Sequence, residues 1–317
     1  MKLTCASFFA GVGGIDLGFE QAGFEIIYAN EIDKYAVETF KANSKAFMDH
    51  RSILDVPTSE IPDFDIMLAG FPCQAFSIAG YRKGFEDKGR GDLYFELERI
   101  FAAKQPKIIF LENVKNLVSH DQGKTFAIIE QSLIAHGYHL KYQVMNACEY
   151  GNIPQNRERI YIVCFKDRAL MEKFTFPEKI PLTTKIQDLL QDEATIEQKY
   201  FYTEKTPFFP KLVESIKDAS TLYQWRRQYV RENKNNLCPT LTANMGTGGH
   251  NVPLLNVKGT PQGIRKLTPR ECFNFQGYPQ EFVLPPLSNA SLYKQAGNSV
   301  VVPVIRRIAE QIKLALA

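Results

Sequence analysis

The first half of the chain alternates short apolar runs with amphipathic stretches, and this alternation restricts the fold more than any other feature. Apolar runs typical of β-strands cover residues 4–9, 25–30, 65–70, 107–112 and 160–165. Stretches with helical periodicity lie between them, at residues 15–22, 33–43, 92–104 and 124–136. Strands that are apolar on both faces and alternate with helices form parallel sheets covered on both sides. The sequence therefore predicts an α/β fold with a doubly wound, mainly parallel sheet.

The pattern changes after Pro181, where Asn, Thr, Pro and Gly become frequent and TANMGTGGHN at 242–251 is the most irregular part. Regular structure returns near the end of the chain. Pro303 suits the first turn of a helix, and its apolar stripe should pack on the first domain (Val304, Ile305, Ile308, Ile312 and Leu316). We therefore expect a larger domain of residues 1–182 plus 291–317 and a smaller, loop-rich domain of residues 183–290.

The composition is that of a globular protein with a large core, because 44% of the 317 residues are hydrophobic and 23% are charged. The six cysteines are scattered and form no CxxC pair, which argues against a disulfide framework or a zinc site and favours a reducing cytosol. No apolar run approaches the ~20 residues of a membrane span.

The net charge of +3 is unevenly distributed along the chain. Residues 219–270 carry eight basic side chains against one acidic side chain, Glu232, whereas the remainder carries 30 basic and 34 acidic residues. Such a stretch indicates a surface for a polyanion, and the alternative is an ordinary solvated surface.

The segment after the first strand, FFAGVGGIDLGF at 8–19, indicates a ligand site. Ligands of open α/β sheets bind at the carboxyl ends of the strands. The third glycine of a dinucleotide fingerprint counted from Gly11 and Gly13 would fall at Asp16, which argues against a diphosphate. Glu31 follows the second strand, where a carboxylate commonly binds ribose hydroxyls. An adenosine cofactor without a diphosphate, such as S-adenosylmethionine, fits this pattern; a purely structural turn is the alternative.

Two further predicted strands end in candidate catalytic residues, at the same carboxyl edge of the predicted sheet. AGFPCQAFSIAG at 69–80 places Cys73 on a proline-stiffened loop, and KIIFLENVKN at 107–116 places Glu112 at the end of an apolar run. Free cysteine is usually a small buried hydrophobe. A carboxylate at the end of such a run, however, is costly to desolvate without a function. Together the thiol and the acid suggest covalent attack on a substrate with protonation alongside.

Six motifs in order resemble the DNA (cytosine-5)-methyltransferases of the compact bacterial restriction–modification type. They are FAGVGG at 9–14, GFPCQAFS at 70–77, ENVKN at 112–116, QNRERIYIV at 155–163, RKLTPRECFNFQGYP at 265–279 and QAGNSVVVP at 295–303. The resemblance spans nearly the whole chain and is weakest between residues 170 and 260. It implies a catalytic and cofactor-binding domain for 1–182 plus 291–317 and a target-recognition domain for 183–290.

The resemblance implies four catalytic residues. Cys73 matches the nucleophile that adds to carbon 6 of cytosine, and Glu112 matches the acid that hydrogen-bonds ring nitrogen 3 and the amino group. Arg157 and Arg159 match a basic pair, of which Arg159 is the stronger candidate for contacting the base or Glu112. Phosphate binding or surface pairing is the alternative for both arginines.

The implied cofactor is S-adenosylmethionine, with S-adenosylhomocysteine as product and no metal. Its expected pocket residues are Phe9, Ala10, Gly11, Gly13, Gly14, Glu31, Ile32, Ile53, Gly70, Pro72, Asn298 and Ser299. One position departs from the family pattern. Ser52 stands where the family often has an aspartate that reads the adenine amino group, although Ile53 can still pack on the ring.

The implied substrate is double-stranded DNA with its cytosine flipped out, because the ring must be attacked on its face. The loops of TLTANMGTGGHNVP at 240–253 should enter the major groove, where each base pair presents a distinct pattern. The expected DNA-binding residues are Gln74, Ser77, Arg226, Arg227, Thr242, Asn244, Thr247 and His250. The alternative for His250 is a loop histidine whose hydrogen bonds are made within the protein.

Two other functions compete with this interpretation. A small-molecule thiol enzyme would explain Cys73, but no histidine lies in a motif-like context beside it. A transfer-RNA cytosine-5 methyltransferase shares most of the motifs, but its Cys-Phe-Thr tripeptide is missing from this chain. Since the first motif begins at residue 9, we expect a bacterial or phage enzyme. It should be a cytoplasmic monomer without membrane contact, and a cognate restriction endonuclease would act separately.

Overall fold

The computed structural model describes residues 2–72, 93–246, 252–257 and 263–317, and the chain divides into two compact units. Unit 1 comprises Met1–Met145, Glu158–Glu178 and Val304–Ala317, and unit 2 comprises Asn146–Arg157 and Lys179–Pro303. Residues 146–157, 179–182 and 291–303 thus belong to unit 2, whereas the sequence pattern grouped them with the larger domain.

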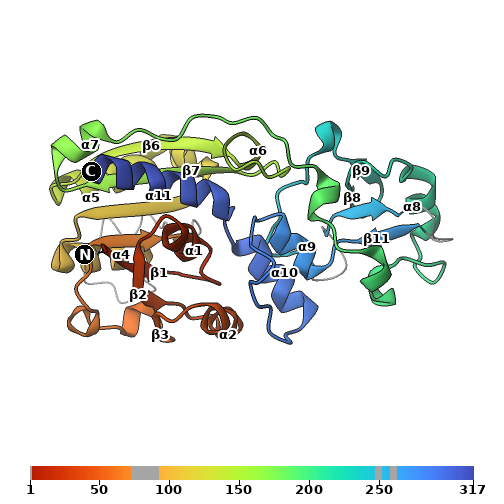
Figure 1. The fold of residues 1–317 in the computed structure, drawn as a ribbon, viewed down its shortest axis with the longest axis horizontal. Helices are drawn as coiled ribbons and strands as arrows, with labels where there is room; N and C mark the ends of the chain where they lie inside the picture. The colour runs from red at the N-terminus through yellow and green to blue at the C-terminus, as the bar shows by residue number, and fades with distance from the viewer. Residues whose placement is uncertain (1, 73–92, 247–251, 258–262) are drawn as a thin grey trace. The chain divides into compact units, whose positions relative to one another are not determined.

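Unit 1 is built on a seven-stranded sheet with helices on both faces (Figure 1). Its strands are β1 (Thr4–Phe8), β2 (Glu25–Asn30), β3 (Phe47–Asp49), β4 (Ile66–Ala69), β5 (Ile108–Val114), β6 (His139–Asn146) and β7 (Glu158–Phe165), in the order β3-β2-β1-β4-β5-β7-β6. The pairs from β3 to β5 are parallel, and β7 runs antiparallel to β5. The predicted doubly wound, mainly parallel α/β fold is confirmed.

The strand order reverses between β1 and β4. From β1 the chain proceeds outward through β2 and β3 on one side, and β4 and β5 lie on the other side. Phe8 pairs with Ala69 in the register of β1 and β4, so the two carboxyl ends lie side by side. Open α/β sheets bind their ligands at such a reversal. The loops that begin at Phe9 and Gly70 both leave the sheet there.

The helices of unit 1 are α1 (Gly14–Gln21), α2 (Lys34–Asn43), α4 (Leu93–Lys104), α5 (Lys124–Ala135), α7 (Arg168–Lys173) and α11 (Val302–Leu316). One face of the sheet forms a continuous buried cluster with α4 and α5. On the other face Phe110 of β5 meets Phe19 of α1, with ring centroids 5.2 Å apart. A Cβ on Gly18 would lie 2.6 Å from the Cβ of Ile305, so α11 packs directly on α1. The predicted packing of the closing helix is confirmed.

Unit 2 contains a small sheet that the sequence pattern did not reveal. Its strands β8 (Tyr223–Trp225), β9 (Val230–Glu232), β10 (Leu254–Asn256) and β11 (Ile264–Lys266) form antiparallel pairs in the order β11-β10-β8-β9. Its helices are α6 (Ala147–Tyr150), α8 (Phe209–Ser215), α9 (Pro269–Asn274) and α10 (Asn289–Asn298). Phe208 stacks on Trp225 with ring centroids 4.6 Å apart, and Leu212 and Leu254 complete this core.

Candidate active site

The loop after β1 turns into α1 through backbone conformations that favour glycine. Phe9, Gly11 and Gly13 have φ values of 56°, 58° and 84°, and Gly13 caps the helix. A Cβ on Gly11 would meet no heavy atom within 4 Å, so open space lies beside this glycine. A side chain there would be strained by the positive φ and would project into that space. The loop thus presents bare backbone at the strand reversal.

Glu31 is fixed to this loop by its carboxylate. Its Oε2 accepts a hydrogen bond from the backbone N–H of Gly11 at 2.8 Å, and its Oε1 accepts one from the N–H of Asp33 at 2.8 Å. Each carboxylate oxygen retains a further lone pair for a hydroxyl donor. The open space at Gly11 and this oriented carboxylate fit the ribose end of an adenosine-type cofactor.

The segment after β3 shapes the neighbouring surface. The Ser52 hydroxyl accepts from the N–H of Leu54 at 3.3 Å and caps a short helical turn, Ile53–Asp55. Ile53 is buried, whereas Ile32 is 65% exposed. Ser52 is therefore engaged with its own backbone, and Ile32 offers apolar surface beside Glu31.

Asp16 lies in the first turn of α1 and is 2% exposed. Its Oδ2 accepts a hydrogen bond from the Ser7 hydroxyl at 2.9 Å. Its Oδ1 has no hydrogen-bond partner among the residues that the structure describes. Burial raises the pKa of Asp16 from 3.8 to about 7, partly offset by the Ser7 hydrogen bond.

The ends of β4 and β5 bring Glu112 close to the backbone that leads into Cys73. A Cβ on Gly70 would lie 3.5 Å from Oε2 of Glu112. The Asn113 side-chain amide donates to the carbonyl of Phe71 at 2.8 Å, and both residues are buried. This hydrogen bond ties the segment before Pro72 to the end of β5. Pro72 itself is exposed.

Glu112 and Arg159 form an ion pair at the edge of the sheet. The Nε of Arg159 lies 3.1 Å from Oε1 of Glu112, and the two side chains are 15% and 11% exposed. Arg159 also donates to the carbonyl of Glu158 at 2.8 Å. The pair is mostly shielded from water, so its Coulomb attraction is stronger than that of a surface pair. Arg159 thus orients the Glu112 side chain.

Arg157 lies in a different environment from Arg159, within unit 2. It is 3% exposed, and its guanidinium donates to the carbonyls of Leu241 at 2.8 Å, Gly297 at 3.2 Å and Ser299 at 2.5 Å. These are backbone acceptors on two separate segments. Arg157 thus joins segments of unit 2.

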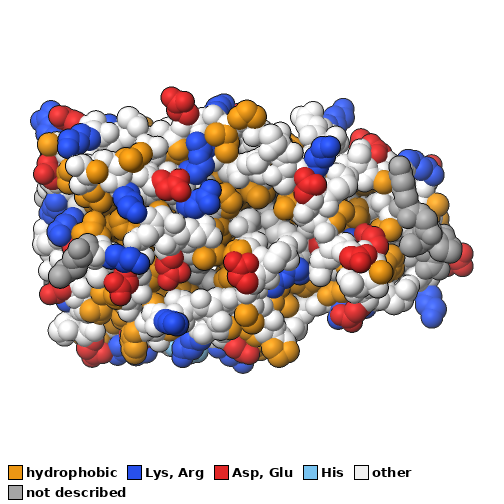
Figure 2. Space-filling view, in the orientation of Figure 1, with side chains coloured by type: hydrophobic (Ala, Val, Ile, Leu, Met, Phe, Trp, Pro, Cys, Tyr) orange, Lys and Arg blue, Asp and Glu red, His pale blue; other side chains and the backbone are white. Residues whose placement is uncertain are grey.

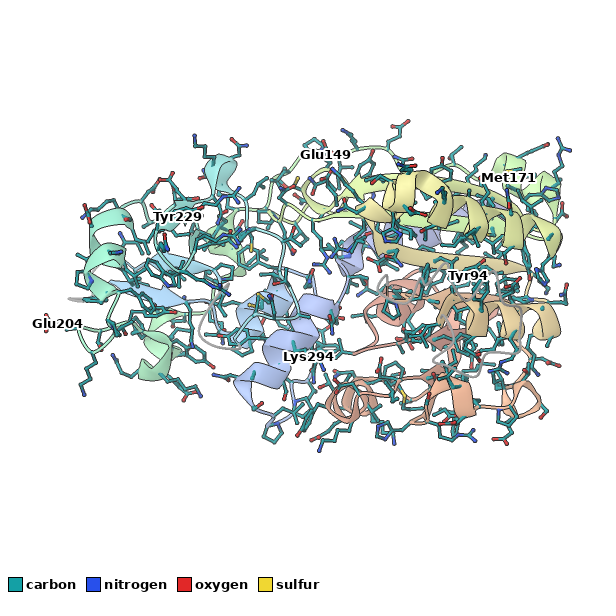
Figure 3. All side chains as sticks on the ribbon, turned by 180° about the vertical axis from the view of Figure 1, so that it is seen from behind. Tyr94, Glu149, Met171, Glu204, Tyr229 and Lys294 are labelled. Carbon is teal, nitrogen blue, oxygen red and sulfur yellow. The ribbon has the colours of Figure 1, made fainter. Side chains whose placement is uncertain are left out.

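The expected DNA-binding residues that the structure describes are exposed. Arg226 and Arg227 lie at the turn between β8 and β9, where the Arg226 N–H donates to the carbonyl of Tyr229 at 2.9 Å and Arg227 has a φ of 63°. Tyr229 is 61% exposed (Figure 3). The Thr242 hydroxyl donates to Oδ1 of Asn244 at 2.6 Å.

Arg265 does not belong to the basic surface expected of residues 219–270. It is fully buried, and its guanidinium pairs with Glu193 at 2.6 Å and Glu271 at 2.8 Å. Its charge is neutralised inside unit 2 and is unavailable to a polyanion. On the face drawn in Figure 2, acidic and basic side chains of unit 1 are interspersed.

Several expected site residues lie outside the described ranges, namely Cys73, Gln74, Ser77, Thr247 and His250. Within the described ranges, His, Cys, Asp and Glu residues form no group that could hold a metal ion. In the same part of the chain, every helix is too short or too polar to cross a membrane.

The sequence pattern missed two buried amides that hold backbone segments, one in each unit. Asn113 follows Glu112 in the quoted ENVKN motif, and Gln155 opens QNRERIYIV. Gln155 is fully buried and donates to the carbonyl of Phe275 at 2.6 Å. Both residues lie in motifs, and this was the feature of the sequence that could have identified them. The identity of an amide side chain, however, predicts neither whether it is buried nor which group it hydrogen-bonds.

Comparisons with known proteins identify the family. The C-5 cytosine-specific DNA methylase model matches residues 3–314. The chain is 59% identical over 312 residues to the Type II methyltransferase M.Bsp6I of Bacillus sp. (strain RFL6), covering 98% of each chain. It is 39% identical to M.HhaI of Haemophilus parahaemolyticus, covering 97% of this chain and 93% of that one.

Solved structures share the fold at low identity. The Entamoeba histolytica methyltransferase EhMeth superposes with a TM-score of 0.75 at 18% identity, over 100% of this chain and 99% of that one. Spodoptera frugiperda DNMT2 gives the same TM-score at 17% identity, with 100% of both chains covered. Together with the matched family model, these findings show that the chain belongs to the C-5 cytosine-specific DNA methylase family.

Proposed function

We propose that the protein methylates carbon 5 of a cytosine flipped out of duplex DNA, at a short specific sequence, through a covalent Cys73 adduct. Family membership and the Type II relatives make it a DNA cytosine-5 methyltransferase of the restriction–modification type. The observation that carries the assignment of the site is the shielded Glu112–Arg159 pair, close to the backbone that leads into Cys73.

The proposed reaction begins with the Cys73 thiolate, whose sulfur forms a bond to carbon 6 of the cytosine. The displaced electron pair makes carbon 5 nucleophilic, and carbon 5 forms the bond to the methyl group. S-adenosylmethionine, when bound, supplies that methyl group and leaves as S-adenosylhomocysteine. Loss of the carbon 5 proton to a base then returns the electron pair to the ring and expels the thiolate. The enzyme is regenerated unchanged.

Glu112 is proposed to hold ring nitrogen 3 and the exocyclic amino group while the thiolate adds. Negative charge develops on the ring in that step, and a proton that the protonated Glu112 carboxyl donates to nitrogen 3 neutralises it. Arg159 keeps the Glu112 carboxylate oriented toward the base. The ring must be approached from its face, so the cytosine has to leave the helical stack.

The cofactor pocket is proposed to lie at the strand reversal of unit 1. The open space at Gly11 and the Glu31 carboxylate support this assignment for the ribose end. Ile53 and the exposed Ile32 are proposed to contact the adenine. The remaining proposed members in unit 1 are Phe9, Ala10, Gly13, Gly14, Gly70 and Pro72. Asn298 and Ser299, which belong to unit 2, are also proposed as cofactor-binding residues.

Recognition of the DNA sequence is assigned to unit 2. Arg226 and Arg227 are proposed to bind phosphates, since their side chains are exposed at a hairpin turn. Thr242 and Asn244 are proposed to contact base edges or the backbone. The same role is proposed for Thr247 and His250. Gln74 and Ser77, which belong to unit 1, are proposed to lie near the flipped base and its phosphates.

A comparison of methyl transfer to duplex DNA with methyl transfer to transfer RNA distinguishes this function from its main alternative, a transfer-RNA cytosine-5 methyltransferase. The relatives that are 39% to 59% identical carry Type II names, which favours DNA, whereas the likeness to DNMT2 concerns the fold alone. We expect labelled methyl incorporation into genomic DNA, recovery of 5-methylcytosine after digestion, and no incorporation with Cys73→Ser. Methylation of transfer RNA but not DNA would overturn the proposal.

The cellular setting is also part of the proposal. We expect a monomer in the bacterial cytoplasm, with any cognate endonuclease as a separate protein. A monomeric mass in sedimentation, with and without a target duplex, would support it. A stable dimer on a single site would contradict it.

A further inference from the structure

Residues 240–246 are the described start of the proposed recognition loops, and we call them the recognition segment. They are held by the side chains of Gln155 and Arg157, which we call the 155–157 clamp. The N–H of Leu241 donates to Oε1 of Gln155 at 3.3 Å, and its carbonyl accepts from Arg157 at 2.8 Å. Both polar backbone groups of one residue are thus bound by side chains two positions apart. The Thr240 hydroxyl adds a hydrogen bond to the carbonyl of Asn156 at 2.5 Å.

The same clamp holds the carboxyl end of α10. Arg157 donates to the carbonyls of Gly297 and Ser299, at 3.2 Å and 2.5 Å. Gln155 donates to Oε1 of Gln276 at 3.2 Å, and Gln276 in turn donates to the carbonyl of Ala296 at 2.6 Å. In Figure 3, Glu149 marks the segment that leads to the clamp and Lys294 marks α10.

The recognition segment and α10 also touch directly. A Cβ on Gly297 would overlap the carbonyl group of Thr242 and lie 2.5 Å from the backbone nitrogen of Ala243. No side chain fits between the two backbones. A shift of residues 241–243 therefore displaces the end of α10 or breaks buried hydrogen bonds, and the reverse holds for a shift of α10.

We infer that the 155–157 clamp couples DNA binding at the recognition segment to cofactor binding at Asn298 and Ser299. The inference rests on the proposed roles of these residues. Arg157 is then a positioning residue, because its guanidinium is engaged by three backbone carbonyls that belong to both segments. Such coupling is reciprocal. The factor by which the cofactor raises the affinity for DNA equals the factor by which DNA raises the affinity for the cofactor.

The test measures the dissociation constant of a target duplex with and without saturating S-adenosylhomocysteine. The ratio of the two constants is the coupling factor, and coupled sites typically give roughly 5- to 150-fold. We expect such a factor in the native protein. Arg157→Lys should reduce it below about 2-fold, because one ammonium cannot bridge carbonyls that a planar guanidinium spans. Gly297→Ala should have the same effect by separating the two backbones.

Two variants distinguish coupling from a loss of stability. Thr221→Val removes a buried hydrogen bond to the carbonyl of Asn233 (2.6 Å) in unit 2, outside the clamp, and should leave the coupling factor unchanged. Tyr278→Phe removes a hydroxyl 2.5 Å from Oγ of Ser299 and should fold readily. It should reduce the coupling factor at least 2-fold, which keeps the inference testable if the other variants do not fold.

A coupling factor of one in the native protein would overturn the inference. So would an unchanged factor in Tyr278→Phe, or in either Arg157→Lys or Gly297→Ala. Failure of the native protein to bind or methylate DNA at all would instead contradict the proposed function.

Discussion

Glu112 and Arg159 form an ion pair across adjacent antiparallel strands, with Nε 3.1 Å from Oε1. In the register of β5 and β7, Glu112 pairs with Tyr161 and Arg159 pairs with Val114. The two charged residues are therefore diagonal neighbours on one face of the sheet. Two adjacent strands of the buried sheet therefore orient the proposed catalytic acid.

Replacing this acid should separate binding from chemistry. Glu112→Gln keeps the shape of the side chain but removes the carboxylate, so we expect kcat to fall roughly 10²- to 10⁴-fold while the DNA dissociation constant changes little. Glu158→Gln is the matched control, because Glu158 pairs with Lys115 at the protein surface. Single-turnover methylation rates and DNA titrations measure both quantities. Near-native turnover in Glu112→Gln would exclude Glu112 from the chemistry.

The turn between β8 and β9 should contribute to phosphate binding. We expect Arg226→Ala/Arg227→Ala to weaken DNA binding and to lower the slope of log affinity against log salt by ~1–2, since each phosphate contact contributes about 0.9. Arg168→Ala/Lys173→Ala, on α7 of unit 1, is the control and should leave the slope unchanged. An unaltered slope in the Arg226/Arg227 variant would place these side chains in solvent.

The buried pairs of Arg265 should be essential to the stability of unit 2. Arg265→Met leaves the carboxylate of Glu271, itself fully buried, without its cation. Breaking a buried pair in this way typically costs about 3–5 kcal/mol. Urea unfolding should show a lower midpoint. Arg231→Met, at an exposed position of β9, should have little effect. Equal midpoints for both variants would contradict this account of the Arg265 pairs.

Asp16 should make the stability depend on pH. The unfolded chain releases this proton near pH 3.8 and the folded chain near pH 7, so the folded state binds more protons between these values. The favourable contribution is complete below pH 3.8 and is lost as the pH rises toward 7. Asp16→Asn should abolish this dependence, because an amide does not titrate in this range. Parallel pH profiles for the two proteins would contradict the shift.

The central strands could be predicted from sequence because both of their faces are buried. Thr4–Phe8 and Glu25–Asn30 match the predicted runs within one residue. β6 was missed, since it lies at the edge of the sheet and much of it is partly exposed, so its sequence lacks an apolar run. The strands of unit 2 have three residues each, which is too short for a period of two to stand out.

The candidate site could be predicted only where a side chain is chemically conspicuous. Glu112 is a carboxylate at the end of an apolar run. A charged residue in that position is unusual, and the local sequence alone is enough to recognise it. Gln155 depends on Leu241 and Phe275, 86 and 120 residues away, and Arg265 depends on Glu193, 72 residues away. Partners at such separations arise from the tertiary fold, so Arg265 resembled a surface charge in the sequence.

The most direct test of the central claim uses a target duplex that contains 5-fluorocytosine, incubated with S-adenosylmethionine. If Cys73 adds to carbon 6, the methylated adduct must lose the substituent on carbon 5 as a cation before the thiolate can leave. Fluorine cannot leave in that way. We expect the protein to remain covalently attached to DNA through Cys73, and mass spectrometry of the peptide should show the methylated base on that residue. Full turnover without an adduct, or an adduct on Cys148 or Cys272, would contradict the proposed mechanism.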